Sequence, residues 1–395
     1  AGCLVGSEMC IRDRGMTFDL SYNECPRITA VEVSAYSNLD SWGLASQYDY
    51  HGGIVEDCKF TGLRSMVGGT QWREYLDAWE GTTVRRCTFL DLWTSPTELT
   101  IIDDCNWAVW AFSASFYDNY FESGNSSEYA YAIYFGDYCF IKNNRFKNVA
   151  ISGEGIQNWI AANTFYLNSN QDAGIMAFNS LGIKIHDNRF INEGSYTTES
   201  DNVAGIRFGN PTWSFSLGST AVEVANNYFY RTSIDGMYNS QHRYTTITGN
   251  MMEESLGIRF GVDWSSGDSW GAEDLLITNN TIVGYSNHRA QIDLGGSFGS
   301  EDGSVEHAMV TNNSIVSGGP WPHHLITLST KNNNVDAEGF MVLGNTLTST
   351  STSPPLGVYF LGYDDLTTSD GETFVQVANN SLYGTYGITI NDCDI

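Results

Sequence analysis

Two arginines, an aspartate and a tyrosine are the residues whose spacing most clearly suggests chemistry. Arg207, Arg259 and Asp293 stand at the fourth position of three similar segments, AGIRF, LGIRF and AQIDL, and Tyr238 lies between the two arginines in the chain. Two guanidinium groups can bind a carboxylate bidentately and acidify the proton beside it, which a tyrosine could accept and return. In this first interpretation the row performs β-elimination in a uronate-containing polysaccharide. Across the enzymatic interpretations, Tyr238, Arg259 and Asp293 are the candidate catalytic residues and Arg207 is substrate-binding.

The same row has a second interpretation as a hydrolase site and a third as a structural feature. Asp293 and Asp263 could form the carboxylate pair of a glycoside hydrolase, in which the separation of the two groups decides the stereochemistry. Arg259 and Asp293 could equally form an ordinary surface ion pair that contributes under about 1 kcal/mol. All three interpretations stay open at the level of sequence.

Aromatic and basic residues in the segments beside this row are further candidates for substrate binding. Tryptophan rings can stack on the C–H faces of sugars, although they can also cover the strands beneath them. Besides Arg207, the predicted substrate-binding residues are Trp213, Trp264, Trp270, His288 and Arg289. No cofactor is certain. The acids Asp268 and Asp364–Asp365 are compatible with Ca²⁺, but without EF-hand spacing they assign no metal ligand.

A repeated asparagine segment indicates the structure that must position these residues. An apolar side chain stands three residues before each repeated asparagine and another stands two residues after it. Cys58 and Cys87 occupy the equivalent place in two earlier segments with the same apolar neighbours. The repeated asparagines are Asn119, Asn144, Asn163, Asn188, Asn227, Asn250, Asn280, Asn313, Asn345 and Asn380.

The repeat predicts short strands that meet at asparagine corners. Alternating apolar and polar residues mark strands with one buried face, and an asparagine between two apolar positions interrupts that alternation. We expect each asparagine to adopt the left-handed conformation of a corner and to hydrogen-bond to its neighbours in a ladder. A second strand recurs between corners, at 131–135, 173–178, 204–208, 256–260, 290–294, 324–328, 356–360 and 386–390.

Together these strands predict an all-β fold, a right-handed parallel β-helix of about twelve coils. The asparagine ladder with coils of variable length resembles the pectin-lyase-like superfamily over about residues 50–390. That superfamily includes polysaccharide lyases, glycoside hydrolases, phage tailspikes and surface adhesins. The resemblance implies extracellular polysaccharide work without selecting a reaction, since the chain has no NTD…DD…GHG series and no WIDH segment.

The charge and apolar composition of the chain limit the classes of binding partner. The 46 acidic and 19 basic residues give a formal charge of −27, which opposes binding to nucleic acid or to anionic membranes. No apolar stretch approaches the roughly 18 residues that span a bilayer. The charge is typical of a secreted or cell-surface protein.

None of the eight cysteines forms a CxxC pair, and Cys58 and Cys87 are expected as buried free thiols, with an isolated disulfide as the alternative.

The first residues look foreign to the repeat. The segment 6–14 (GSEMCIRDR) resembles a translated sequencing-adapter tail on a metagenomic gene fragment, so residues 1–16 are expected to be non-native or irregular. Residues 17–395 are then predicted to form a single β-helix domain.

These observations predict an extracellular protein that binds, and in the enzymatic version cleaves, a polysaccharide along an outer groove. If it is an enzyme, a polysaccharide lyase or a glycoside hydrolase is expected. The alternative is a non-catalytic surface protein, such as an adhesin or a tail-fibre or tailspike shaft. The sequence does not distinguish a monomer from a trimer.

Overall fold

The computed structural model describes the strands and corners of the chain, and the statements below concern these residues. They are 12–14, 17–19, 28–33, 54–61, 73–78, 81–90, 107–123, 131–168, 173–194, 203–209, 219–237, 242–262, 272–284, 290–294, 305–317, 324–329, 339–361 and 375–391. Among them, no helix is long and apolar enough to cross a membrane.

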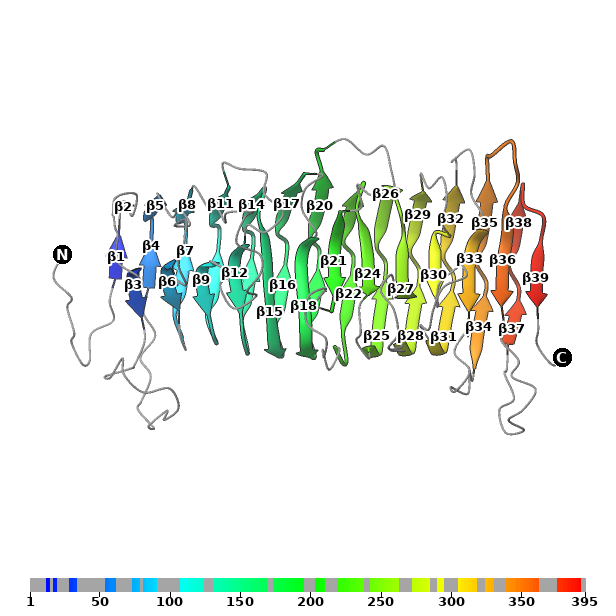
Figure 1. The fold of residues 1–395 in the computed structure, drawn as a ribbon, viewed down its shortest axis with the longest axis horizontal. Helices are drawn as coiled ribbons and strands as arrows, with labels where there is room; N and C mark the ends of the chain where they lie inside the picture. Colours follow the sequence, from blue (N-terminus) through cyan, green and yellow to red (C-terminus); the bar gives the residue numbers. More distant parts are fainter. Residues whose placement is uncertain are drawn as a thin grey trace, which may run out of the picture. The chain divides into compact units, whose positions relative to one another are not determined.

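The protein is an all-β, right-handed parallel β-helix, which confirms the prediction. Each coil contributes one strand to each of three parallel sheets (Figure 1), and the described residues contain 13 coils. The chain forms two compact units, Ala1–Thr164 and Phe165–Ile395. The strand β17 (Thr164–Leu167) begins at the last residue of unit 1 and continues in unit 2.

Unit 1 contains the early coils. Its first sheet comprises β1 (Arg12–Arg14), β4 (Ile54–Glu56), β7 (Thr83–Arg85), β10 (Ser115–Tyr117), β13 (Phe140–Lys142) and β16 (Trp159–Ala161). Its second sheet comprises β2 (Thr17–Asp19), β5 (Lys59–Thr61), β8 (Thr88–Phe89), β11 (Tyr120–Glu122) and β14 (Arg145–Lys147). Its third sheet comprises β3 (Ile28–Val33), β6 (Arg73–Ala78), β9 (Trp107–Ala111), β12 (Tyr131–Phe135) and β15 (Ala150–Ile156).

The strand β1 lies inside the segment for which an irregular tail is expected, and it pairs with β4. The division into a tail and a single domain stays a prediction.

Unit 2 continues the same order of strands. Its first sheet comprises β19 (Lys184–His186), β22 (Glu223–Ala225), β25 (His242–Thr248), β28 (Ala272–Thr278), β31 (Val305–Thr311), β34 (Phe340–Leu343) and β37 (Val375–Ala378). Its second sheet comprises β20 (Arg189–Asn192), β23 (Tyr228–Tyr230), β26 (Met251–Ser255), β29 (Thr281–Gly284), β32 (Ser314–Ser317), β35 (Thr346–Ser349) and β38 (Ser381–Tyr383). Its third sheet comprises β18 (Ala173–Leu181), β21 (Ala204–Phe208), β24 (Ser233–Met237), β27 (Ile258–Val262), β30 (Ile292–Leu294), β33 (His324–Ser329), β36 (Leu356–Leu361) and β39 (Ile388–Asn391).

The asparagine ladder forms as predicted and connects successive coils. In unit 2, the Oδ1 atom of Asn250 accepts hydrogen bonds from both the backbone N–H and the side-chain amide of Asn227, at 2.9 and 3.0 Å. Asn227 accepts the same two hydrogen bonds from Asn188. These asparagines are 1% exposed. The buried corner thus satisfies its own polar groups, which is the condition for placing amides inside a core.

One expectation about the ladder is wrong. The left-handed residue is the one before each ladder asparagine, as at Asp187 (φ 57°), Asn226 (φ 57°) and Asn279 (φ 56°), and the ladder asparagines themselves do not have positive φ. The chain turns from one sheet to the next one residue before the asparagine, and the asparagine side chain can then face the interior and reach the next coil.

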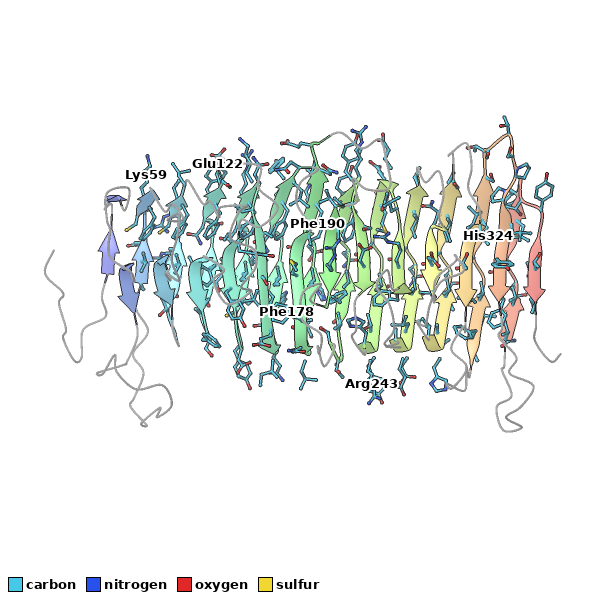
Figure 2. All side chains as sticks on the ribbon, in the orientation of Figure 1. Lys59, Glu122, Phe178, Phe190, Arg243 and His324 are labelled. Carbon is cyan, nitrogen blue, oxygen red and sulfur yellow. The ribbon has the colours of Figure 1, made fainter. Side chains whose placement is uncertain are left out.

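The apolar residues three before and two after each ladder asparagine form a continuous core in each unit. In unit 1, the rings of Phe60, Phe89 and Phe121 stack at centroid distances of 4.6 and 4.5 Å. In unit 2, Phe190 (labelled in Figure 2) stacks on Phe229 at 4.9 Å. All of these side chains are fully buried. Such ring columns bury a large apolar area in a fixed geometry and so define the register of the coils.

The cysteines at the ladder position are free thiols, as expected. Cys58 and Cys87 are buried and form no disulfide among the described residues, and the same holds for Cys139, which lies at a different corner. Burial raises the pKa of the Cys87 thiol to about 12. Since the thiolate is the reactive form, this cysteine is a structural residue and not a nucleophile.

His242 is a fully buried histidine at the start of β25 in unit 2. Its ring packs edge-on against Phe208 and Phe260, with centroid distances of 6.0 and 5.8 Å. Its Nδ1 accepts a hydrogen bond from the backbone N–H of Ser219. Burial disfavours the charged imidazolium and lowers the pKa of His242 to about 4.

We expect His242 to make the fold acid-sensitive. Because its pKa is about 4 when folded and near 6.5 when exposed, the unfolded chain takes up a proton first as the pH falls. The stabilisation is complete above pH 6.5 and decreases by up to about 3 kcal/mol on the way to pH 4. Urea denaturation across this pH range measures the loss, and His242→Gln, which cannot titrate, should flatten the slope. Equal slopes in the two proteins would contradict this prediction.

Candidate functional site

The predicted row forms a column of charged residues on the third sheet of unit 2. The strand register pairs Arg207 with Asp235, Asp235 with Arg259, and Arg259 with Asp293. The column continues through Thr327. The prediction that Arg207, Arg259 and Asp293 lie in one row along the axis is therefore confirmed by the register.

The position between the two arginines is occupied by Asp235 and not by Tyr238. The segment that contributes it, SIDGM (β24), has Gly236 where the two neighbouring coils have Phe208 and Phe260. A Cβ atom on Gly236 would lie 2.1 Å from the ring of Phe260, so the Phe260 ring fills the space that an apolar side chain would need. Tyr238 itself lies outside the described residues.

The charged column is buried, contrary to the expected open groove. Arg207 is 4% exposed, Asp235 0%, Arg259 1% and Asp293 1%. The neighbours Ile258 and Phe260 on β27 are also fully buried, although strand alternation turns them to the opposite face from Arg259. Both faces of this strand are therefore shielded from water.

Arg259 and Asp235 form a bidentate ion pair within the column. Nε and Nη2 of Arg259 donate to the two oxygens of Asp235, at 2.9 and 2.6 Å, in a bidentate arrangement. Nη2 of Arg207 lies 3.9 Å from the same carboxylate. Asp235 thus lies between two guanidinium groups. Arg259 and Asp293, expected as an exposed pair, are both buried, and the bidentate partner of Arg259 is Asp235. A carboxylate engaged on both oxygens holds the guanidinium in a fixed orientation.

The remaining predicted site residues lie outside the described residues, and their roles stay predictions. They are Tyr238, Trp213, Trp264, Trp270, His288 and Arg289, together with the acids Asp263, Asp268, Asp364 and Asp365.

A row of aromatic side chains on the first sheet of unit 1 is a surface that the sequence analysis missed. Phe140 and Trp159 are paired across β13 and β16, and their rings meet edge to face at 5.2 Å. Tyr117 lies 5.5 Å from Phe140 on the other side. Trp159 is 45% exposed, an unusual position for so large an apolar ring. We call Tyr117, Phe140 and Trp159 the aromatic row.

Basic residues flank the aromatic row. Lys142, in register with Tyr117 and Ala161, has no ion-pair partner among the described residues. Around the ladder corner, the guanidinium of Arg145 lies over the ring of Tyr120, 5.7 Å from its centroid. Lys59 and Glu122, labelled in Figure 2, project from the second sheet of the same unit. The row could have been predicted by reading the outward positions two and four residues before each ladder asparagine.

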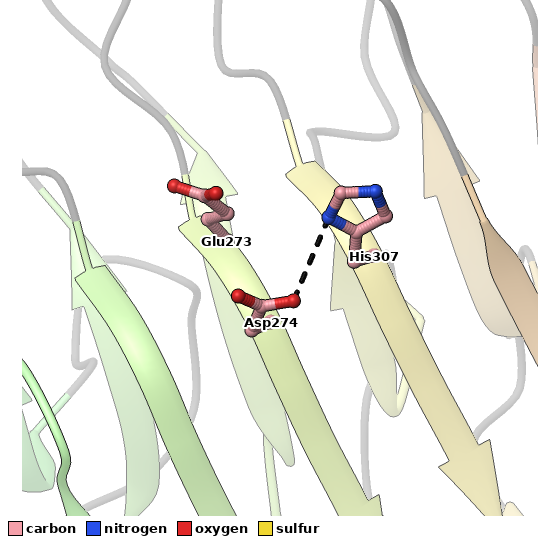
Figure 3. A group of neighbouring side chains, drawn as sticks. All are labelled: Glu273, Asp274 and His307. Atoms are coloured by element: carbon pink, nitrogen blue, oxygen red, sulfur yellow. Dashed lines mark ion pairs between the residues drawn. The ribbon is translucent and has the colours of Figure 1, made fainter.

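A third group of side chains combines two carboxylates with a histidine in unit 2. Glu273 and Asp274 lie near the start of β28, and His307 lies on the neighbouring strand β31 (Figure 3). Oδ1 of Asp274 is 3.5 Å from Nδ1 of His307, and one ligand atom from each of the three residues lies within 4.8 Å of the others. We call these residues the acid–histidine cluster.

Comparisons with known proteins concern the fold. No protein-family model matches the sequence, and no curated protein matches it. Among solved structures, the chain is similar to the surface protein and adhesin PfbA of Streptococcus pneumoniae (12% identity, 81% of this chain and 89% of that chain, TM-score 0.49). It is also similar to the A-module of a mannuronan C-5 epimerase of Azotobacter vinelandii (10% identity, 90% and 88%, TM-score 0.43). A third is a tailspike protein of an E. coli bacteriophage in complex with a hexasaccharide (13% identity, 79% and 53%, TM-score 0.34).

Proposed function

We propose that the protein binds a polysaccharide on the aromatic row of unit 1, in an extracellular or cell-surface setting. The observation that carries the proposal is the exposed ring of Trp159 beside Phe140, on adjacent strands of one sheet. Neighbouring strands are about 4.8 Å apart, so rings at equivalent positions form a ladder along the axis. A linear glycan lying along that axis would contact Phe140 and Trp159 with successive sugar rings.

The chemistry around the row favours sugar binding over protein or nucleic-acid binding. Aromatic rings contact the apolar C–H faces of sugars, and polar neighbours such as Lys142 and the hydroxyl of Tyr117 can hydrogen-bond to hydroxyl or carboxylate groups. The overall charge of −27 opposes nucleic acid. Lys142 favours a glycan that carries some carboxylates over a neutral one, since an ammonium group is an efficient point contact for an anion.

Binding is a better supported activity than cleavage. The arginines and aspartates of the charged column are between 0% and 4% exposed, and Arg259 and Asp235 are engaged with each other. A glycan could reach them only by displacing both the cover of the column and this ion pair. Lyase and hydrolase chemistry on that column therefore stays a prediction, to be tested together with binding.

We expect Trp159→Ala to weaken binding to a retained polysaccharide by about 30-fold, the loss of roughly 2 kcal/mol that follows removal of a central aromatic contact. Affinity electrophoresis of the full chain in gels that contain neutral or uronate-rich polysaccharides measures the retention. Assays for reducing ends and for unsaturated products on the same panel test cleavage.

The matched control is Tyr386→Ala, which removes an aromatic side chain that is 76% exposed and lies on unit 2. This variant should be retained like the wild type. If Trp159→Ala is also retained like the wild type, the aromatic row is not the binding surface. If no polysaccharide retains the wild type, the alternative of a non-catalytic structural protein is favoured.

A further inference from the structure

We propose that the acid–histidine cluster of Glu273, Asp274 and His307 binds a divalent metal ion of the zinc type. This proposal does not rest on glycan binding and concerns residues of unit 2 alone. Figure 3 shows Asp274 between the other two side chains, with Glu273 on the same strand and His307 on the adjacent one.

The spacing between the donor atoms fits a metal better than a direct hydrogen bond. Nδ1 of His307 and Oδ1 of Asp274 are 3.5 Å apart, longer than the usual hydrogen bond between a nitrogen and an oxygen. Two ligands bound tetrahedrally to zinc at about 2.0–2.1 Å are separated by about 3.3 Å. The observed pair therefore needs a shift of only a few tenths of an ångström to share an ion.

Glu273 can complete the site without giving up its present partner. One oxygen of Glu273 pairs with Nε of Arg243 at 2.8 Å. A carboxylate has a second oxygen with free lone pairs, which can ligate a metal while the first keeps its hydrogen bond. Arg243 then acts as an outer partner that orients the ligand, an arrangement that is common around protein-bound zinc. Water supplies the fourth position.

The backbone holds the three residues on stiff elements. The strands β25, β28 and β31 pair from His242–Ala272–Val305 to Thr248–Thr278–Thr311, with the pairing interrupted only at Tyr244, Asp274 and His307. Asp274 and His307 occupy equivalent left-handed corners, with φ values of 56° and 50°. A Cβ atom added to Gly339, on the following coil, would lie 3.1 Å from the imidazole of His307, so the ring packs closely against that glycine.

One imidazole nitrogen and two carboxylates favour zinc over calcium or magnesium. Ca²⁺ and Mg²⁺ prefer oxygen ligands in larger numbers than two carboxylates provide. An imidazole nitrogen with two carboxylate oxygens suits Zn²⁺ and its neighbours in the transition series, and it suits open coordination with water.

The test is calorimetric titration of the chelator-treated full chain with Zn²⁺, followed by thermal denaturation with and without the ion. We expect one equivalent to bind at this cluster and to raise the melting temperature. His307→Asn and Asp274→Asn should each weaken binding at least 10-fold, the smaller of the losses seen when even outer partners of a metal are removed. Asparagine tolerates left-handed corners, so both variants should keep the fold, which circular dichroism verifies.

The matched control is His186→Asn. Nε2 of His186 lies 3.4 Å from a single carboxylate, that of Glu223, and so resembles the cluster without its third ligand. This variant should bind Zn²⁺ like the wild type. The proposal is wrong if His307→Asn leaves the Zn²⁺ affinity unchanged, or if Ca²⁺ at the same concentration produces an equal stabilisation that His307→Asn does not reduce.

Discussion

Replacing Asp235 by alanine should destabilise the protein by about 3 to 5 kcal/mol, the range typical of breaking a buried ion pair from one side. The substitution removes the two oxygens that accept from Nε and Nη2 of Arg259 and the carboxylate 3.9 Å from Nη2 of Arg207, in a column with almost no access to water. A buried charge that has lost its partner costs more free energy of folding than the lost hydrogen bonds themselves. Urea denaturation of the full chain, monitored by circular dichroism, measures the difference.

Two further variants separate this explanation from a general sensitivity of the sheet. The double variant Asp235→Ala with Arg259→Met removes the stranded charge and should recover much of the loss, because an apolar side chain of similar length can replace a buried pair. Glu223→Ala removes a carboxylate whose side chain is 40% exposed and should cost under about 1 kcal/mol. A double variant no more stable than Asp235→Ala would show that the ion pair is not the cause.

The second large effect is expected from Asn250→Ala, at the centre of the ladder in unit 2. The substitution removes the acceptor for the backbone N–H and the side-chain amide of Asn227, and it removes the donor to the carbonyl of Val224 and to Asn280. Each buried polar group left without a partner costs about 1–3 kcal/mol, so the total should be about 3 kcal/mol or more. The change in the urea midpoint measures it.

The same substitution at the last ladder position provides the control. Asn380 accepts the same two hydrogen bonds from Asn345, but its coil is only partly buried. Water can replace the lost acceptor there, so Asn380→Ala should cost clearly less than Asn250→Ala. Equal losses at the two positions would mean that the ladder stabilises the coils by something other than burial of its amides.

The ladder and the core could be predicted from the sequence because both are strictly periodic. Phe190 and Phe229, two residues after Asn188 and Asn227, are fully buried, as the offsets require. The second strand at 204–208 agrees with β21 residue for residue. A repeat of this kind satisfies the same packing and hydrogen-bonding requirement in every coil, so its pattern appears many times in the sequence.

The prediction of the row was wrong at Tyr238 for a physical reason that one residue illustrates. The segments AGIRF, LGIRF and AQIDL have an apolar residue on either side of the outward position, but Gly236 follows Asp235 because the ring of Phe260 fills that space from the next coil. Gly153 follows Ser152 in the same way in unit 1, beside the ring of Phe135. When a side chain of one coil fills space next to a glycine of another coil, a sequence pattern that treats each coil separately cannot detect it.

The burial of the row could not be predicted either. Alternation shows that Arg259 faces away from the core side of its strand, but not whether that face is open to solvent. The sequence pattern also does not show that Asp274 and His307 occupy equivalent left-handed positions on neighbouring strands, which brings their side chains into contact. These interactions depend on how each corner directs the chain in space, and the sequence pattern specifies those directions only in part.

The direction of the ladder gives the two edges of a stack of coils different chemistry. In unit 2, each asparagine offers its carbonyl oxygen to the coil before it and presents two N–H donors to the coil after it. Removing coils from the carboxyl side would leave two buried N–H donors of an asparagine without acceptors. Removing them from the amino side would leave its side-chain oxygen without donors, and the amide N–H that reaches back to the coil before, as from Asn227 to the carbonyl of Ile185, can still donate to the carbonyl of Ala225 in its own coil. Since an unsatisfied N–H is tolerated less well than an unsatisfied oxygen, such a stack should bear shortening from its amino side better than from its carboxyl side.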